Sequence, residues 1–127
     1  MKKLQIFIIS IFVLSILSIS AITIVNAANR NISSKGIEFI KSKEGCKLTA
    51  YKLPGEQYYT IGYGHYGADV YAGMTITQAR ADELFAQDII PRVNAVNNFL
   101  NTKGISVTQG QFDTLVSLQY NTGYGWQ

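Results

Sequence analysis

The chain has 127 residues but few of the kinds that cross-link or bind metals. Cys46 is its one cysteine, so no disulfide can form within the chain. No histidine or second cysteine stands at metal-ligand spacing from it. We therefore expect Cys46 to be a small, buried, hydrophobic residue.

Charge is also scarce. The chain has eleven Lys and Arg and eight Asp and Glu, so its formal net charge is +3. Without Lys2 and Lys3 there are nine basic and eight acidic residues, and the net charge is +1. Such a balance gives no support to nucleic-acid binding. Six basic residues and only two acids lie between Arg30 and Lys52. This local excess would attract an anionic polymer such as a cell wall, but charge alone favours a solvated helix face.

The N-terminal segment differs from the rest of the chain. Lys2 and Lys3 precede an uncharged, apolar run from Leu4 to Val25, and small residues follow up to Ala27. This pattern is typical of a signal peptide cut after Ala27, although the run is also long enough for a retained membrane anchor. Either way we expect the rest, residues 28–127, to be a single exported domain at the cell envelope or secreted.

A helix is expected from Ser33 or Ser34, as its cap, to Glu44, where Gly45 stops it. Ile40 and Glu44 share one face of this helix, which places an acid on an apolar face. The negative end of the helix dipole and partial burial both disfavour the charged form of Glu44. Its pKa should therefore be raised, as a general acid requires.

Two strands follow, over residues 48–53 and 57–66, joined by a turn at Pro54-Gly55. Alternation in the second strand gives one nearly bare face, made by Tyr58, Thr60, Gly62 and Gly64. Glycines in a strand often mark the close approach of a ligand. We therefore take Tyr58, Gly62 and Gly64 as candidate substrate-binding residues, with Thr60 at the edge of that surface.

His65 would lie on the opposite face from Thr60. Histidine is a frequent catalytic residue, but this position favours a structural hydrogen bond or ion pair, with Asp69 as the candidate partner.

Two more helices complete the pattern. Thr77 caps a long one, in which Pro91 should cause a kink or a split near Ile90. Thr108 and Gln111 form a capping box for the last one. The fold class is therefore α+β, with Glu44 at the junction of helix and hairpin. Glycoside hydrolysis uses such an acid together with a second group, but a basic binding domain fits these features nearly as well.

The order of residues then resembles the phage-lysozyme family, glycoside hydrolase family 24, which includes endolysins and other muramidases. The resemblance covers nearly all of residues 34–125. Its most specific parts are Glu44-Gly45 and the segment Thr60-Ile61-Gly62-Tyr63-Gly64-His65. Further matching segments run over residues 76–88 and 111–123.

The resemblance implies a lysozyme-like fold, in which an N-terminal helix and a small β-hairpin lobe are linked by a long helix to a helical lobe. It implies a muramidase that cleaves the β-1,4 bond between N-acetylmuramic acid and N-acetylglucosamine in peptidoglycan. Glu44 matches the catalytic acid, and Thr60 matches the threonine that helps position the attacking water. No metal or cofactor is implied, and we expect a monomer.

The sequence departs from the family pattern at the second catalytic position. Where the family has Asp or Cys, this chain has Leu53 or Pro54, and its hairpin carries one extra residue. One hypothesis is that Glu56 does the work of the second carboxylate. The other is that none is used, and that Thr60 and the acetamide group of the substrate suffice.

The family's further helices would follow the Asn121-Thr122-Gly123 segment, so we expect the second lobe to be incomplete in a chain ending at Gln127. The alternative function is a non-catalytic wall-binding protein or an inactive lysozyme descendant. A lytic transglycosylase and a membrane-tethered interaction protein are further alternatives.

Overall fold

The computed structural model describes residues 29–122, so the predicted leader and the segment from Gly123 onward lie outside it. Within this range no helix combines the length and the apolar character needed to span a membrane. The elements are α2 (Ser34–Glu44), β1 (Lys47–Tyr51), β2 (Tyr59–Gly62), β3 (His65–Gly67), α3 (Gln78–Lys103) and α4 (Gln109–Thr122).

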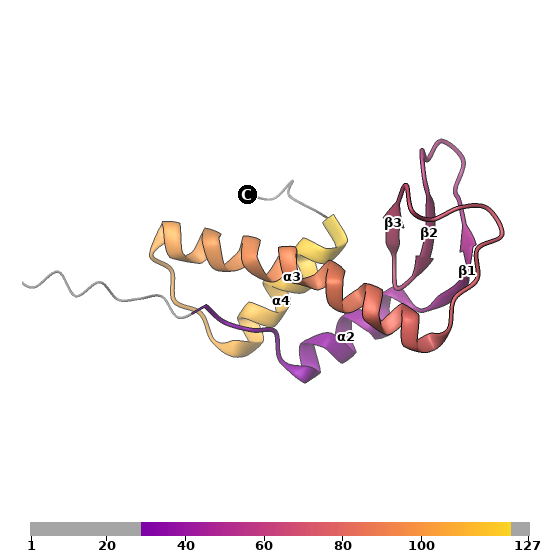
Figure 1. Ribbon diagram of the computed structural model, residues 1–127. Coiled ribbons are helices and arrows are strands. Elements are labelled where there is room, and N and C mark those ends of the chain that lie inside the picture. Colours follow the sequence, from indigo (N-terminus) through magenta and orange to yellow (C-terminus); the bar gives the residue numbers. More distant parts are fainter. Residues whose placement is uncertain (1–28, 123–127) are drawn as a thin grey trace, which may run out of the picture.

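A small antiparallel sheet, in the order β1-β2-β3, lies at one end of the molecule, and α3 runs from it to the opposite end beside α4 (Figure 1). Because α3 is long, it contributes to two cores. Leu84 packs with Ile61 and Val70 under the sheet. The larger core joins the three helices through Ile40, Phe85, Ile89, Val93, Val96, Leu100, Phe112 and Val116. The predicted α+β class is confirmed.

The predicted helix ends are confirmed by their caps. The Ser33 side chain accepts a hydrogen bond from the Gly36 N–H, and Gly45 ends α2 with φ +67°. Thr77 caps α3 in the same way. Thr108 and Gln111 exchange two backbone-to-side-chain hydrogen bonds, which is the expected capping box.

The predicted single strand over residues 57–66 is wrong. The chain reverses after Gly62, and β3 pairs back on β2 with Thr60 opposite Tyr66 and Ile61 opposite His65. Gly62 and Gly64 have φ values of +64° and +96°, in the left-handed region that side chains disfavour. The sequence analysis interpreted Gly62 and Gly64 as part of a bare strand face, but they lie at the two ends of the tight turn between β2 and β3.

Of the predicted kink or split near Ile90, the split is wrong, because α3 is one continuous helix with Pro91 inside it. Proline removes a single backbone donor. Ile89 before it and Val93 after it are both buried in the helical core. Packing on both sides therefore keeps the two halves in one helix.

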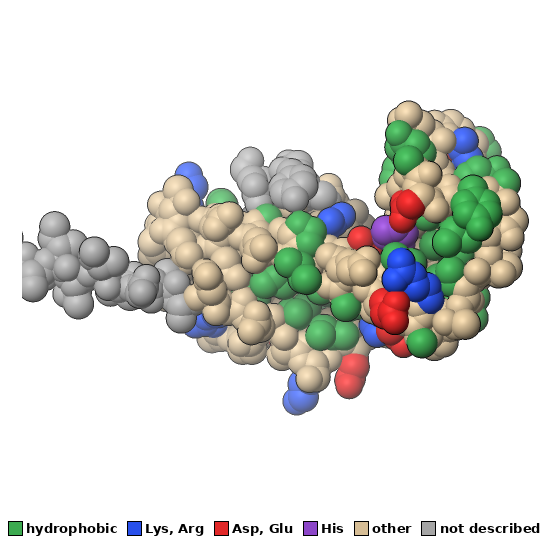
Figure 2. Space-filling model, viewed as in Figure 1, with side chains coloured by type: hydrophobic (Ala, Val, Ile, Leu, Met, Phe, Trp, Pro, Cys, Tyr) green, Lys and Arg blue, Asp and Glu red, His purple; other side chains and the backbone are tan. Residues whose placement is uncertain are grey.

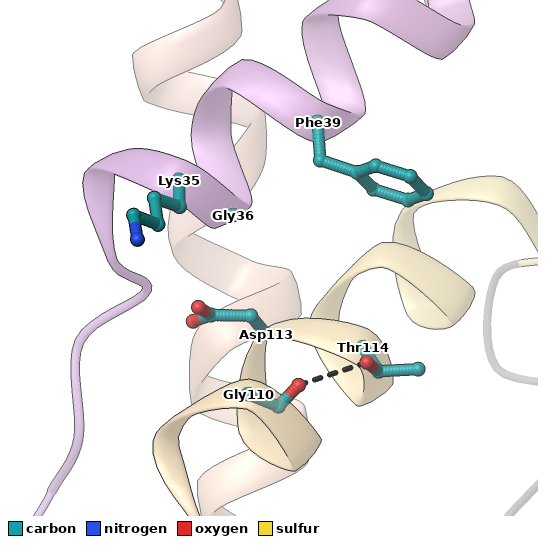
Figure 3. Close-up of a pocket in the computed structure, with 6 residues that line it drawn as sticks. All are labelled: Lys35, Gly36, Phe39, Gly110, Asp113 and Thr114. Atoms are coloured by element: carbon teal, nitrogen blue, oxygen red, sulfur yellow. Dashed lines mark hydrogen bonds between the residues drawn. The ribbon is translucent and has the colours of Figure 1, made fainter.

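A pocket of about 230 Å³ lies beside the contact between the first turns of α2 and α4, and its lining residues are Lys35, Gly36, Phe39, Gly110, Asp113 and Thr114 (Figure 3). Asp113 accepts hydrogen bonds from the backbone N–H and the hydroxyl of Ser33, the cap of α2. These bonds lower the pKa of Asp113 against the opposing effect of burial. The carboxylate thus ties the beginning of α2 to α4.

Gly36→Ala is expected to destabilise the fold, because a Cβ there would lie 2.8 Å from Asp113 Cγ and 2.8 Å from Ile32 Cγ1. Overpacking of this kind costs about 1–3 kcal/mol. Gly110→Ala is the matched control, since its Cβ would meet nothing within 4 Å. Replacing a helical glycine in open space is expected to raise stability by about 0.5–1 kcal/mol. Thermal unfolding of both variants tests this, and equal effects would contradict it.

Candidate active site

The end of α2 meets the turn between β2 and β3. Gly45 ends the helix, and Lys47, the first residue of β1, pairs with Gly62, the last residue of β2. This register brings Glu44 beside the turn at Tyr63-Gly64. A Cβ built on Gly64 would lie 3.7 Å from Glu44 Oε2, so the turn passes in van der Waals range of the carboxylate.

Glu44 is an exposed residue, yet enough protein surrounds its carboxyl group to raise its pKa by burial. No hydrogen bond or ion pair joins this carboxylate to another residue between positions 29 and 122. A carboxyl group that is open to solvent and whose pKa is raised is suited to donating a proton to a bound molecule. The direction of the pKa shift agrees with the sequence analysis.

Thr60 and Gly62 lie in β2, deeper than the sequence analysis expected. Thr60 is 7% exposed and is flanked by Tyr51 of β1 and Tyr66 of β3. Gly62 is buried, and a Cβ on it would lie 3.5 Å from that of Ala81 in α3. Gly62 therefore allows close packing of the sheet on α3, while Gly64 is the glycine that borders Glu44.

Glu56 and Tyr58 belong to the connection between β1 and β2. Glu56 Oε2 accepts a hydrogen bond of 2.8 Å from the Leu53 N–H, which closes the turn at Pro54-Gly55. Tyr58 packs edge-on against Tyr66, with ring centroids 5.6 Å apart. The Tyr66 hydroxyl also accepts from the Tyr58 N–H. Both residues thus have structural partners within the hairpin lobe.

Tyr63, in the turn beside Glu44, is held from both helices that flank it. Its hydroxyl accepts a 2.9 Å hydrogen bond from Gln78 of α3. Its carbonyl oxygen accepts one of 2.9 Å from the Tyr120 hydroxyl of α4. Its ring stands edge-on to Phe85, and the Lys41 ammonium lies 4.9 Å from its centroid. The turn is therefore fixed by partners outside the sheet.

His65 follows this turn and bridges two acids. Its Nε2 lies 3.0 Å from Asp69, the expected partner, and its Nδ1 lies 2.9 Å from Asp88 of α3. Burial opposes the charged imidazole, but the hydrogen bonds to Asp69 and Asp88 outweigh it and raise the pKa of His65. The predicted structural bond with Asp69 is confirmed, and the bond to Asp88 joins the sheet to α3.

The surface is hollowed between the sheet and the helical body, and acidic side chains and the histidine gather where the two meet (Figure 2). Cys46, two residues after Glu44, is half-buried rather than buried. Across residues 29–122, no three His, Cys, Asp or Glu side chains are placed to hold a metal ion.

Comparison with known protein families agrees with this arrangement. The sequence model of the phage lysozyme family matches residues 41–127, which include Glu44 and the turn beside it. The chain belongs to the phage lysozyme family.

Similar proteins support the same membership. The chain is 49% identical over 96 residues to the endolysin of Bacillus phage B103, covering 75% of this chain and 35% of the endolysin. It is 50% identical over 97 residues to the endolysin of Lactococcus phage c2, covering 72% and 39%. The chain thus spans little more than a third of either relative.

A solved structure of similar sequence supports the same fold. The muramidase domain of SpmX from Asticaccaulis excentricus is 41% identical and superposes with a TM-score of 0.66, covering 74% of this chain and 60% of that one. The predicted lysozyme-like fold is therefore confirmed.

The sequence analysis missed three residues that hold the site of this phage lysozyme family member together. Tyr120, Asp88 and Gln78 were not connected to the site. Their partners lie 57, 23 and 15 positions away along the chain. The available signal for Tyr120 was its hydroxyl, since buried tyrosine hydroxyls usually find a partner.

Proposed function

We propose that this protein is a glycosidase that hydrolyses the glycan strands of bacterial peptidoglycan, with Glu44 as its general acid. The observation that carries the proposal is the Glu44 carboxyl group, open to solvent beside Gly64 and with a pKa raised by burial, in a phage lysozyme family chain. The bond proposed is the β-1,4 linkage between N-acetylmuramic acid and N-acetylglucosamine.

In this mechanism protonated Glu44 donates its proton to the glycosidic oxygen as that bond breaks. The exposed Gly64 leaves room for a sugar ring at the carboxyl group, because it has no side chain. Thr60 is proposed to orient the attacking water from β2. Tyr58 is proposed to contact the glycan from the hairpin lobe, whereas Gly62 is better explained by its packing on Ala81.

Glu56 is proposed to assist as the second carboxylate, since the position that normally holds it has Leu53 or Pro54. Glu56→Gln is expected to lower activity roughly 100-fold, in the range for loss of an acid-base group. Glutamine retains an oxygen that can accept from the Leu53 N–H, so the turn is preserved and only the charge is removed. Unchanged activity would remove Glu56 from the mechanism.

Residues 1–27 are proposed to direct export, as a signal peptide cut after Ala27 or as an anchor, so that residues 28–127 reach the wall as a monomeric lysozyme-like domain. The apolar run between Lys3 and Asn26 supports this. Mass spectrometry of the exported protein tests it. A mature chain beginning at Ala28 indicates cleavage, and a product that stays in the cytoplasm excludes export.

Product analysis tests the bond assignment. The full chain, purified in mild detergent, is incubated with isolated peptidoglycan, and the released fragments are identified by mass spectrometry. Hydrolysis of the proposed bond gives fragments with a reducing N-acetylmuramic acid end. Anhydro ends would indicate a lytic transglycosylase, and reducing N-acetylglucosamine ends would indicate that the other linkage is cut.

A further inference from the structure

Tyr120 connects the helical body to the turn at Glu44. It lies in the last turns of α4, and its hydroxyl donates a 2.9 Å hydrogen bond to the Tyr63 carbonyl across 57 positions of sequence. Tyr63 is followed directly by Gly64, where an added Cβ would lie 3.7 Å from Glu44 Oε2. A single hydrogen bond therefore links α4 directly to the segment that borders the Glu44 carboxyl group.

The surroundings of Tyr120 fix its position. Its ring packs against Phe85 of α3, with centroids 5.4 Å apart, and the Arg92 guanidinium lies 5.9 Å from its centroid. Burial raises the pKa of the Tyr120 phenol, and the negative charges of Asp88 and Glu44 raise it further, so the hydroxyl stays protonated and able to donate. The side chain is a fixed donor rather than a titrating group.

We propose that Tyr120 is a positioning residue, whose hydroxyl holds the Tyr63-Gly64 turn against Glu44 and so maintains the partly buried environment of the catalytic carboxyl group. The inference rests on the proposed function, because it assigns Tyr120 a role in the same reaction. Tyr120 touches the turn and acts on Glu44 through it.

The Tyr120 bond holds the backbone of the turn, whereas Gln78 and Phe85 hold the Tyr63 side chain. Gly62 and Gly64 both have positive φ, and glycine restricts the backbone least of all residues, so the turn depends on outside contacts for its exact place. The Tyr63 carbonyl is partly buried, and a buried acceptor that loses its donor is unfavourable. Without the Tyr120 hydroxyl the turn is expected to move toward solvent, which would hydrate Glu44.

Other charged groups near the junction limit how a shift in the Glu44 pKa is interpreted. They are Lys41 of α2, His65 of β3, and Asp88 and Arg92 of α3. Tyr120→Phe changes none of these charges and retains the ring between Phe85 and Arg92. A change in Glu44 titration would therefore report solvation of the carboxyl group.

Two measurements on Tyr120→Phe test the proposal in the full chain. The first is the pH profile of glycan hydrolysis, in which kcat is expected to fall roughly two- to tenfold with KM unchanged, as for loss of one ordinary hydrogen bond. The alkaline limb is expected to move to lower pH. The second is an NMR titration of ¹³C-labelled Glu carboxyl groups, in which Glu44 is expected to titrate at lower pH than in the parent.

Ser33→Ala is the matched control, because it removes a cap and a partly buried hydrogen bond at the far end of α2. It is expected to lower the unfolding temperature without moving the Glu44 titration. The NMR titration requires no turnover, so it tests Tyr120 even if the proposed hydrolysis fails. An unchanged Glu44 titration in Tyr120→Phe, or an equal shift in Ser33→Ala, would overturn the proposal.

Discussion

His65→Asn is expected to cause the largest loss of stability among single polar substitutions in the sheet, by about 2–3 kcal/mol near pH 5.5. The imidazole is only 15% exposed and bridges Asp88 at 2.9 Å and Asp69 at 3.0 Å. Its removal leaves the half-buried Asp88 carboxylate without its cationic partner. For a domain of this size the loss corresponds to a fall of roughly 10–20 °C in Tm.

The effect is expected to depend on pH. The pKa of His65 is raised in the folded protein, so its contribution is complete below about 6.5 and is lost as the pH rises through the folded value. The hydrogen bond from His65 lowers the pKa of Asp69, whose contribution is complete above about 3.8 and is lost as the pH falls through the folded value. The difference between parent and variant is therefore largest between about pH 4 and 6.5.

Asp69→Asn provides the comparison, because that carboxylate is 66% exposed. Exposed ion pairs contribute about 0–1 kcal/mol, so this variant should lose much less stability than His65→Asn. Thermal unfolding of the three proteins at pH 5.5 and pH 9 is the measurement. A His65→Asn defect that is equal at both pH values would show that the charge of the imidazole is unimportant.

Glu44→Gln is expected to lower kcat/KM for peptidoglycan by about 10²–10⁴, the contribution of a general acid. Glutamine retains the shape of the side chain but has no proton to donate to the glycosidic oxygen. Because the carboxylate makes no hydrogen bond or ion pair with other residues in 29–122, the fold should be unaffected. Kinetic assays and thermal unfolding together test both statements.

Glu38→Gln is the matched control for that substitution. Glu38 is an exposed acid on the same helix, two turns before Glu44. The change in net charge is identical, so any effect of charge on attraction to the wall appears in both variants. An equal fall in activity in both would contradict a specific role for Glu44.

The sequence predicted the features that depend on neighbouring residues. Ser33, Gly45 and Thr77 mark helix ends through contacts within a turn of the chain, and each of these ends is found where expected. The position of Glu44 at the end of α2 follows from the same local chemistry.

The turn at Tyr63-Gly64 was not predicted, because alternation and glycine content fit a continuous strand and a reversal equally well. The choice is made by tertiary contacts, namely the packing of Gly62 on Ala81 and the hydrogen bond from Tyr120. The continuity of α3 through Pro91 has the same origin, since it depends on apolar packing on both sides of the proline.

The spacing of residues along the sequence also does not identify the second catalytic group. Leu53 and Pro54 occupy the positions where a second carboxylate was expected, and Glu56 closes the hairpin turn through the Leu53 N–H. Glu56, three positions after Leu53, can both stabilise the turn and supply a negative charge to the reaction. Only the Glu56→Gln variant separates these two roles.

The most direct test of the account is the release of new reducing ends from isolated peptidoglycan by the full chain and by Glu44→Gln, with binding to the wall measured in the same samples. We expect the parent to release reducing ends and the variant to bind equally well without releasing them. If both proteins bind the wall and neither releases reducing ends, the domain is a wall-binding protein, and the assignment of Glu44 as a general acid is wrong.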